Sequence, residues 1–344
     1  MKRFALLSLL ILFLSATQSV AQLSLSDDAT LSGTIFADYY WMARHHNEDI
    51  EGNNGFWFRR IYMTYDHNLS NGFSTRVRLQ MKSAGDFQSS VAMTPEVKDA
   101  YLKWQNDHHQ ILAGISSTPT WSLVEDVWGY RSVEKSPQDL YDFGSSRDFG
   151  LSVKGDVTSS GNLGYHFFIG NGNSNKPEID RGKKVMFSLA YNLNKNIVIQ
   201  GYGDYNDRTD NPDYYTAQVF GGYQSETLNV GVLYSSQYRD DQLDLSSQTL
   251  DLVSVFTNFK IKHNVKGYLR ADHLFDEYRG GSGNSYIPFA EDVESTFMVA
   301  GADFLLAEQI HLMPNIEAIF YGENDQGVSP DTNIIPRLTL YWTF

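Results

Sequence analysis

The sequence of 344 residues contains no cysteine, so disulfide bonds and thiolate metal sites are excluded. After the first 21 residues it also has no run of about eighteen apolar residues, the length that a membrane-spanning helix needs. The mean hydropathy is −0.36. If the chain crosses a membrane, we therefore do not expect it to do so as a helix.

Basic residues are scarce as well. Lys and Arg together number 27, against 41 Asp and Glu, which gives a formal net charge of −14 at pH 7. A chain with this excess of carboxylates repels the phosphates of DNA and RNA. Nucleic acid is therefore excluded as a partner.

The one long apolar run lies at the start of the chain. Lys2 and Arg3 precede the apolar segment Phe4–Ala16, and a short polar stretch leads to Ser19-Val20-Ala21. A basic start, an apolar middle and small residues before a cut make up a secretory signal peptide, which predicts cleavage after Ala21. The mature domain, residues 22–344, would keep 25 basic and 41 acidic residues, a net charge of −16. With no cysteine after the cut, no lipid anchor is expected.

Beyond the signal peptide, apolar and polar side chains alternate in segment after segment. The alternation is clearest in residues 72–83, 99–105, 185–193 and 334–344. A period of two puts successive side chains on opposite faces of a β-strand. In a closed antiparallel barrel one face meets lipid, the other meets water, and every backbone group is paired. A soluble two-sheet sandwich would show the same period, so the connectors must decide between the two folds.

Short and long connectors alternate along the chain. Seven are tight turns, at residues 69–72, 106–108, 159–162, 194–196, 225–226, 263–264 and 308–309. Eight are long and polar, at approximately 45–55, 84–96, 117–146, 171–183, 206–213, 239–247, 276–293 and 323–332. They join sixteen strands, of which the first is expected at Leu31–Ala43, although a hairpin within 280–293 would change that number. An even number of strands returns both termini to the periplasmic side. The predicted fold class is therefore all-β, a transmembrane antiparallel β-barrel with a water-filled lumen.

Aromatic residues are abundant for so polar a chain. The 21 Tyr, 21 Phe and 6 Trp make up 14% of the sequence, and such rings suit the two interfaces between membrane and water. The last alternating strand ends on Phe344, the end signal that barrel-assembly machinery reads in this class of protein. We therefore predict this machinery as a partner through Phe344, and outer-membrane lipid and lipopolysaccharide as the surroundings.

The longest connector, Ser117–Ser146, follows the fifth predicted strand. Its charged residues are Glu125, Asp126, Glu134, Asp139 and Asp142 against Arg131 and Lys135. The strand phases direct a set of bases toward the lumen from the facing wall: Arg60, Arg76, Arg78, Lys82, Lys103 and Lys154. If this third long loop folds into the lumen, Glu125, Asp126 and Arg131 would face that wall across a constriction with a transverse field. The simpler interpretation is a set of solvated lumen charges.

Ion preference does not follow from the basic wall alone. The same inner faces carry Asp38, Asp66, Asp99, Asp148, Asp156, Asp204, Asp272 and Glu317. The lumen is therefore expected to be close to balanced, with the excess of negative charge in the outer loops.

Histidines and serines give no sign of a metal site or of catalysis. In the pairs His45-His46 and His108-His109, adjacent side chains would point to opposite faces of a strand or, in a turn, into solvent. No serine or histidine stands in a recognisable nucleophile context. No catalytic residue, metal or cofactor is predicted.

Short motifs in the first half of the mature chain resemble the phosphate-selective porin O and P family of outer-membrane porins. They are Phe58-Arg59-Arg60 with Tyr62 and Thr64-Tyr65-Asp66, Lys98-Asp99-Ala100-Tyr101, Gly114–Pro119, and Arg147-Asp148-Phe149-Gly150. The resemblance implies a sixteen-stranded, trimeric pore for passive passage of small hydrophilic solutes. It does not carry over phosphate selectivity, because members that select phosphate have bases on the infolded loop, whereas this loop has five acids and two bases.

The sequence thus predicts an outer-membrane porin of a Gram-negative bacterium that conducts ions and small polar solutes by diffusion. A substrate-specific channel for phosphate, other anions or oligosaccharides is the first alternative. A structural or adhesion barrel whose loops close the lumen is the second.

Overall fold

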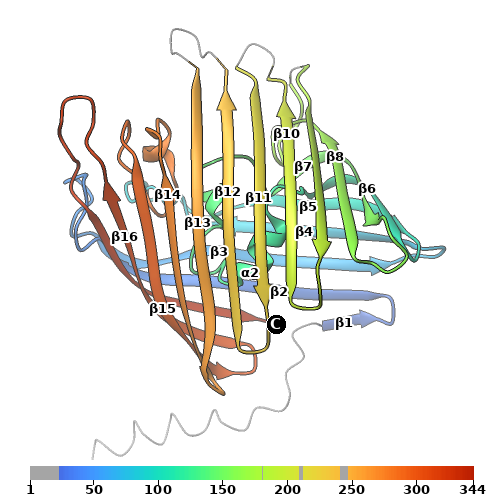
Figure 1. The fold of residues 1–344 in the computed structure, drawn as a ribbon. Helices are drawn as coiled ribbons and strands as arrows, with labels where there is room; N and C mark the ends of the chain where they lie inside the picture. The colour runs from blue at the N-terminus through green and yellow to red at the C-terminus, as the bar shows by residue number, and fades with distance from the viewer. Residues whose placement is uncertain (1–22, 180, 209–211, 241–246) are drawn as a thin grey trace, which may run out of the picture.

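The computed structural model describes residues 23–344, apart from residues 180, 209–211 and 241–246. The signal peptide predicted for residues 1–21 lies outside this part of the chain. The described chain is almost entirely β-strand, with long connectors at one end of the strands and tight turns at the other (Figure 1).

The strands follow one another along the chain as the alternation predicts. They are β1 (Leu23–Ser26), β2 (Ala29–Trp41), β3 (Asn54–Asn68), β4 (Phe73–Lys82), β5 (Thr94–Gln105), β6 (His109–Ser117), β7 (Arg147–Asp156), β8 (Leu163–Gly170), β9 (Lys184–Asn192), β10 (Ile197–Asn206), β11 (Tyr214–Gln224), β12 (Leu228–Arg239), β13 (Gln248–Lys262), β14 (Val265–Leu274), β15 (Ser295–Ala307), β16 (Ile310–Tyr321) and β17 (Asn333–Thr343). The short helices are α2 (Ser122–Trp128), α3 (Pro137–Leu140) and the 3₁₀ turn η1 (Gly281–Gly283). Among the described residues, no helix is long and apolar enough to cross a membrane.

Strands β2 to β17 form a closed ring. Each pairs antiparallel with the next, and β17 pairs with β2 from Arg337 opposite Tyr40 to Thr343 opposite Thr34. Strand β1 pairs with the start of β2 and is not part of this ring. The closed barrel of the described chain therefore has sixteen strands, β2 to β17, which confirms the predicted number and fold class.

The start of the barrel differs from the prediction. The first barrel strand is β2, which begins at Ala29 and ends at Trp41, two residues earlier than the expected Leu31–Ala43. The short strand β1 was not expected, and a tight turn at residues 27–28 folds it back onto β2. The segment 280–293 contains η1 and no hairpin, so the number of strands stands.

The last residue helps to close the ring. Phe344 N donates to Gly33 O at 3.1 Å, and Gly33 N donates to Phe344 O at 2.8 Å. The Phe344 ring lies over Gly33, where any Cβ atom would collide with it. Glycine at position 33 therefore allows the terminal strand to lie flat against β2.

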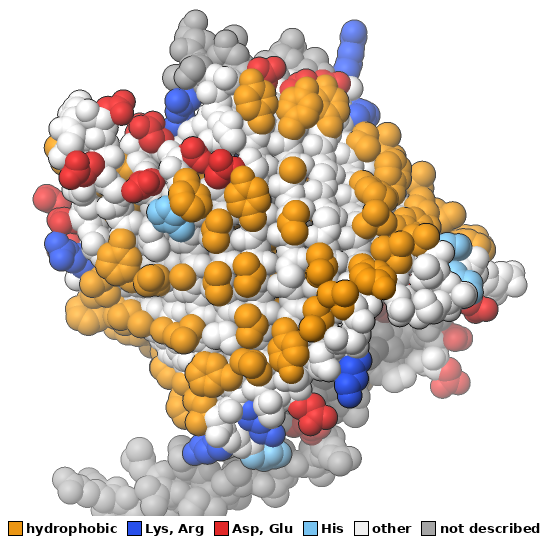
Figure 2. All heavy atoms as spheres, viewed as in Figure 1, with side chains coloured by type: hydrophobic (Ala, Val, Ile, Leu, Met, Phe, Trp, Pro, Cys, Tyr) orange, Lys and Arg blue, Asp and Glu red, His pale blue; other side chains and the backbone are white. Residues whose placement is uncertain are grey.

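The outer wall is apolar. On β9, Val185, Phe187 and Leu189 point outward and are exposed, whereas Met186 and Ser188 point inward and are buried. Figure 2 shows apolar side chains spread over the middle of the outer wall and charged side chains gathered at its two ends. This is the distribution that a bilayer requires of the barrel that crosses it.

Part of the lumen is filled by a hydrophobic core. The connector 118–146 packs against the inner wall, with α2 in contact with β11, β12 and β13 (Figure 1). Trp128 of α2 lies edge-on to Phe256 and Tyr268, with ring centres 5.5 and 6.1 Å away. Side chains of the connector 275–294 join the same core. The barrel is therefore packed on the side of β11 to β17.

Five buried charged side chains tie the connector 118–146 to the opposite wall. Arg59 contacts Glu134 of the connector at 2.8 Å and Asp38 at 3.6 Å. Arg337 contacts Asp38 at 3.3 Å and Glu317 at 2.9 Å. All five are almost completely buried, so each charge depends on its partners for stabilisation.

Without Arg59, the buried carboxylates of Glu134 and Asp38 would each lose an ion-pair partner. We expect Arg59→Met to lower the free energy of unfolding by about 3 kcal/mol or more. Urea unfolding of the barrel in lipid vesicles measures this. Arg44→Met is the matched control, because Arg44 pairs with Asp331 at 2.8 Å on the exposed surface and should cost less than about 1 kcal/mol. Equal losses in the two variants would contradict a supporting role for the buried network.

Candidate functional site: a passage through the lumen

Two cavities occupy the part of the lumen that the hydrophobic core leaves open. The turn-side cavity, of about 480 Å³, includes Asn229 and Lys266, the second residues of β12 and β14, which lie beside the tight turns. The loop-side cavity, of about 550 Å³, includes Lys82 and residues 172–176 beside the long connectors. Lys98 and Arg147 line both cavities, so the two adjoin there. A solute that crosses the barrel by this route passes these two side chains.

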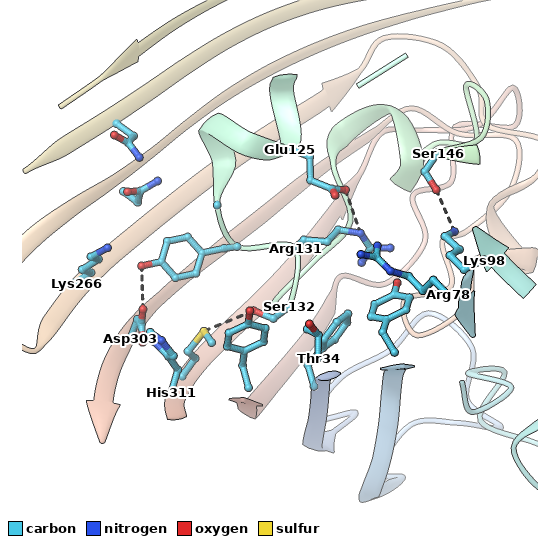
Figure 3. A pocket seen from close by; sticks show the side chains of 18 of the residues that line it. Thr34, Arg78, Lys98, Glu125, Arg131, Ser132, Ser146, Lys266, Asp303 and His311 are labelled. Carbon is cyan, nitrogen blue, oxygen red and sulfur yellow. Dashed lines mark hydrogen bonds and ion pairs between the residues drawn. The ribbon is translucent and has the colours of Figure 1, made fainter. Parts of the chain in front are cut away.

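A β-bulge brings Lys98 to this junction. Arg78 pairs with Asp99 and Leu79 with Val97, which leaves Lys98 as an extra residue in β5. The Lys98 ammonium donates to Ser146 Oγ at 3.1 Å (Figure 3). None of the ion pairs among the described residues includes Lys98. The bulge therefore places at the junction a lysine that forms no ion pair among the described residues.

Asp99 holds the two arginines next to Lys98. Its carboxylate is buried, lies 3.3 Å from Arg78 and accepts a short hydrogen bond from Arg147. Both guanidinium groups are thereby fixed at the wall of the turn-side cavity, which both residues line. Two guanidinium groups share one carboxylate, so the wall at this point carries a net positive charge.

The acids of the connector 118–146 are mostly paired within the lumen. Arg131 lies 3.3 Å from Glu125 (Figure 3) and 3.1 Å from Asp139. Burial raises the pKa of Glu125, and Arg131 opposes that rise. Glu134 pairs with Arg59, and Asp126 lies on the exposed face of α2, away from both cavities. The connector therefore does not present a row of free carboxylates to the passage.

The structure separates the predicted site residues into three groups. Arg78, Glu125 and Arg131 line the turn-side cavity together. Arg60 and Lys82 line the loop-side cavity. The remaining four line neither cavity: Arg76, Lys103, Lys154 and Asp126. Arg76 is paired with Asp66 at 2.6 Å, and the pairing of Lys103 with Ser74 places it toward the turn side.

Bases outnumber acids in both cavities. The described charged residues of the turn-side cavity are Arg78, Lys98, Arg131, Arg147 and Lys266 against Glu125 and Asp303. Those of the loop-side cavity are Arg60, Lys82, Lys98, Arg147, Lys176, Lys184 and Arg208 against Glu96, Asp142 and Asp148. The passage is thus more basic than the balanced lumen expected from the sequence. Several of the inward acids, such as Asp38, Asp272 and Glu317, are buried in ion pairs outside the cavities, and bases that strand phase did not place in the lumen, such as Lys98 and Arg147, line them.

Three important cations were missed by reading strand phase. Arg59 and Lys98 are the extra residues of bulges in β3 and β5, and an extra residue reverses the alternation on which the phase depends. Arg147 is the first residue of β7, outside the segments with a clear phase. All three belong to short motifs that are far apart in the sequence, and the fold brings two of them, Lys98 and Arg147, to the junction. Their place in these motifs was the sequence feature that could have identified them as site residues.

The first histidine pair does not behave as expected. His45 and His46 neither point to opposite faces nor both face solvent: their rings lie 4.3 Å apart, and His45 is 1% exposed. His45 Nδ1 accepts a hydrogen bond from Asn47 N at 3.0 Å. Burial, and then the neighbouring His46, lower the pKa of His45 to about 4. Within the described part of the chain, no three His, Asp or Glu side chains gather as metal ligands do.

The fold is that of known outer-membrane barrels. No family model and no curated protein matches the sequence. Among solved structures, the chain is similar to OmpF of Salmonella typhi in complex with daunomycin (TM-score 0.67, 11% identity, 94% of this chain and 100% of that one). It is also similar to an anion-selective porin from Comamonas acidovorans (TM-score 0.65, 10% identity, 92% and 99%). A third is the trimer form of OmpT, an outer-membrane protein of Vibrio cholerae (TM-score 0.62, 12% identity, 92% and 100%). At these identities the likeness establishes the fold.

The buried His45 should make the barrel less stable in acid. Its pKa is about 4 in the folded protein and about 6.5 in an unfolded chain, so protons favour unfolding as the pH falls from 6.5 toward 4. We expect the wild type to lose roughly 2 kcal/mol more than His45→Gln between pH 7.5 and pH 4.5. Urea unfolding in lipid vesicles at the two pH values tests this. An identical loss in both proteins would show that His45 is not protonated on unfolding.

Proposed function

We propose that the chain is an outer-membrane porin that lets ions and small hydrophilic solutes diffuse through a water-filled barrel. The observation that carries the proposal is the pair of adjoining cavities inside a closed sixteen-stranded wall with an apolar outer surface. Diffusion through such a lumen needs no catalytic residue and no cofactor. Transport by diffusion involves no chemical reaction, and its selectivity comes from the charges and the width of the passage.

A preference for anions is the second part of the proposal. It is supported by the excess of bases in both cavities, although the mature chain as a whole is acidic. Lys98 carries most of the argument, because it stands at the junction of the cavities and no ion pair among the described residues includes it. An anion that passes this point meets a positive potential that nearby carboxylates only partly cancel.

The finer relationship to the phosphate-selective porin O and P family is also a proposal. It is supported by the convergence of two motifs: Arg147 of one motif pairs with Asp99 of another, beside Lys98. Selection of phosphate over other anions would require more than this. Within the connector 118–146, Arg131 is already engaged by two carboxylates, so the infolded segment adds little free positive charge.

Location and assembly follow the same reasoning. A signal peptide cleaved after Ala21 would deliver the chain to the periplasm, and the barrel-assembly machinery would read Phe344 on the last strand. The exposed apolar wall would then face outer-membrane lipid and lipopolysaccharide. We further propose a homotrimer, since one similar barrel of Vibrio cholerae is described as a trimer form.

The charge at the junction should set the ion preference of the channel. We expect purified wild type to give conductance steps in a planar bilayer and a reversal potential in a KCl gradient that favours chloride. Lys98→Gln should lower the permeability ratio of anion to cation by about fivefold, because a charge at about 4 Å in water is worth about 1 kcal/mol. Lys103→Gln, which removes the same charge from a position outside both cavities, should have a much smaller effect.

Two outcomes would contradict this proposal. Wild-type protein that inserts but gives no conductance steps would exclude a pore and favour a structural or adhesion barrel. Equal shifts in Lys98→Gln and Lys103→Gln would leave the pore intact but would remove Lys98 from the role of selectivity residue.

A further inference from the structure

The turn-side cavity has a feature that conduction of simple ions does not require. Four neighbouring strands place rings along its wall: His311 on β16, Tyr341 on β17, Phe36 on β2 and Tyr62 on β3. The register puts His311 opposite Tyr341, and Tyr341 opposite Phe36. Ring centres along this aromatic strip are 5.6, 6.4 and 6.0 Å apart in that order. The strip is therefore continuous across four strands.

The aromatic strip ends at three basic residues, Arg78, Arg131 and Lys98. On the next strand, β4, the Arg78 guanidinium lies 5.7 Å from the centre of the Tyr62 ring. Arg131 and Lys98 stand beside Arg78 (Figure 3). One wall of the cavity is thus aromatic, and the wall that continues from it is cationic.

Packing does not account for the whole strip. Phe36 is 3% exposed and Tyr341 packs against the edge of the hydrophobic core, so these two rings are partly structural. Tyr62 and Tyr341 nevertheless keep part of their surface open to the cavity, and Tyr62 does not belong to the core. The inner face of a water-filled barrel is ordinarily polar, so rings open to the lumen call for a ligand with an apolar surface.

We propose that the turn-side cavity binds organic anions that carry a ring. The carboxylate or phosphate of such an anion would meet Arg78 and Lys98, and its ring would lie on Tyr62 and Tyr341. Offset stacking on an aromatic ring and a charge-assisted hydrogen bond to a guanidinium group are both compatible with these neighbours. The cavity of about 480 Å³ is large enough for a single small molecule.

This inference rests on the proposed porin function and goes beyond it. An anion-preferring pore needs only the bases, and it would treat acetate, inorganic phosphate and benzoate according to their charge and size. A pore with an aromatic strip beside the bases should hold benzoate longer than acetate, because only benzoate contacts both walls. The amide of Asn229, which also lines the cavity, would hydrogen-bond a hydroxyl group of a ring such as that of glucuronate.

Saturable block of the KCl current through the full barrel in a planar bilayer tests the inference. The probes are benzoate and glucuronate, which carry a ring and a charge, acetate and inorganic phosphate, which carry only a charge, and benzyl alcohol, which carries only a ring. We expect benzoate or glucuronate to half-block the current at a concentration about tenfold lower than acetate, inorganic phosphate or benzyl alcohol.

Two variants and a matched control locate the effect. Tyr62→Leu and Tyr341→Leu keep apolar bulk but remove an aromatic face. Each should raise the half-blocking concentration of benzoate about fivefold and leave the half-blocking concentration of acetate unchanged. Tyr101→Leu is the control, because Tyr101 lies on the inner wall at β5 but lines neither cavity. It should behave as the wild type.

The results separate the two proposals. Conductance without any advantage of benzoate or glucuronate over acetate would overturn the inference and leave the porin function in place. Stronger block by inorganic phosphate than by either ring-bearing anion would overturn it as well, in favour of a site for the inorganic ion. Absence of conductance would overturn the porin function and the inference together.

Discussion

The structure depends on the requirement that every backbone N–H and C=O inside a bilayer be paired. A ring of sixteen antiparallel strands satisfies it, and the bonds between Gly33 and Phe344 extend the pairing to the last residue. Because the ring is closed, successive side chains along each strand face the lipid and the lumen in turn. Lipid accepts one set of side chains, and the other set is free to form both a hydrophobic core and a charged passage.

Two bulges decide what the passage contains. Each adds one residue to a strand, so that two neighbouring side chains, Arg59 and Arg60 in β3 and Lys98 and Asp99 in β5, all turn inward. In β3 the extra arginine is used for support, since it binds Glu134 and fixes the connector 118–146. In β5 the extra lysine is left for the passage, while Asp99 holds two arginines beside it. Support and the selectivity that we propose thus come from the same kind of local irregularity, a β-bulge.

The sequence predicts the parts of this structure that lipid imposes and misses those that local packing imposes. The sixteen strands follow from alternation and connector length, because a bilayer enforces both. The inward positions of Arg60, Arg78 and Lys82 follow from the same period. The bulges at Arg59 and Lys98 do not, since an extra residue reverses the phase and leaves no mark in composition. The short strand β1 rests on a local turn that the alternation does not mark, and the core in the lumen depends on contacts between distant segments, which a periodic pattern does not contain.

The core on one side of the barrel makes the route through it eccentric. Strands β11 to β13 contact α2 of the infolded connector, whereas Lys98 and Arg147, where the two cavities adjoin, lie on β5 and β7. At the junction, the wall on the side of β5 and β7 faces the cavities and carries charge, whereas the wall on the side of β11 to β13 packs against α2. Side chains at the junction can therefore change in charge without altering the packing between α2 and β11 to β13.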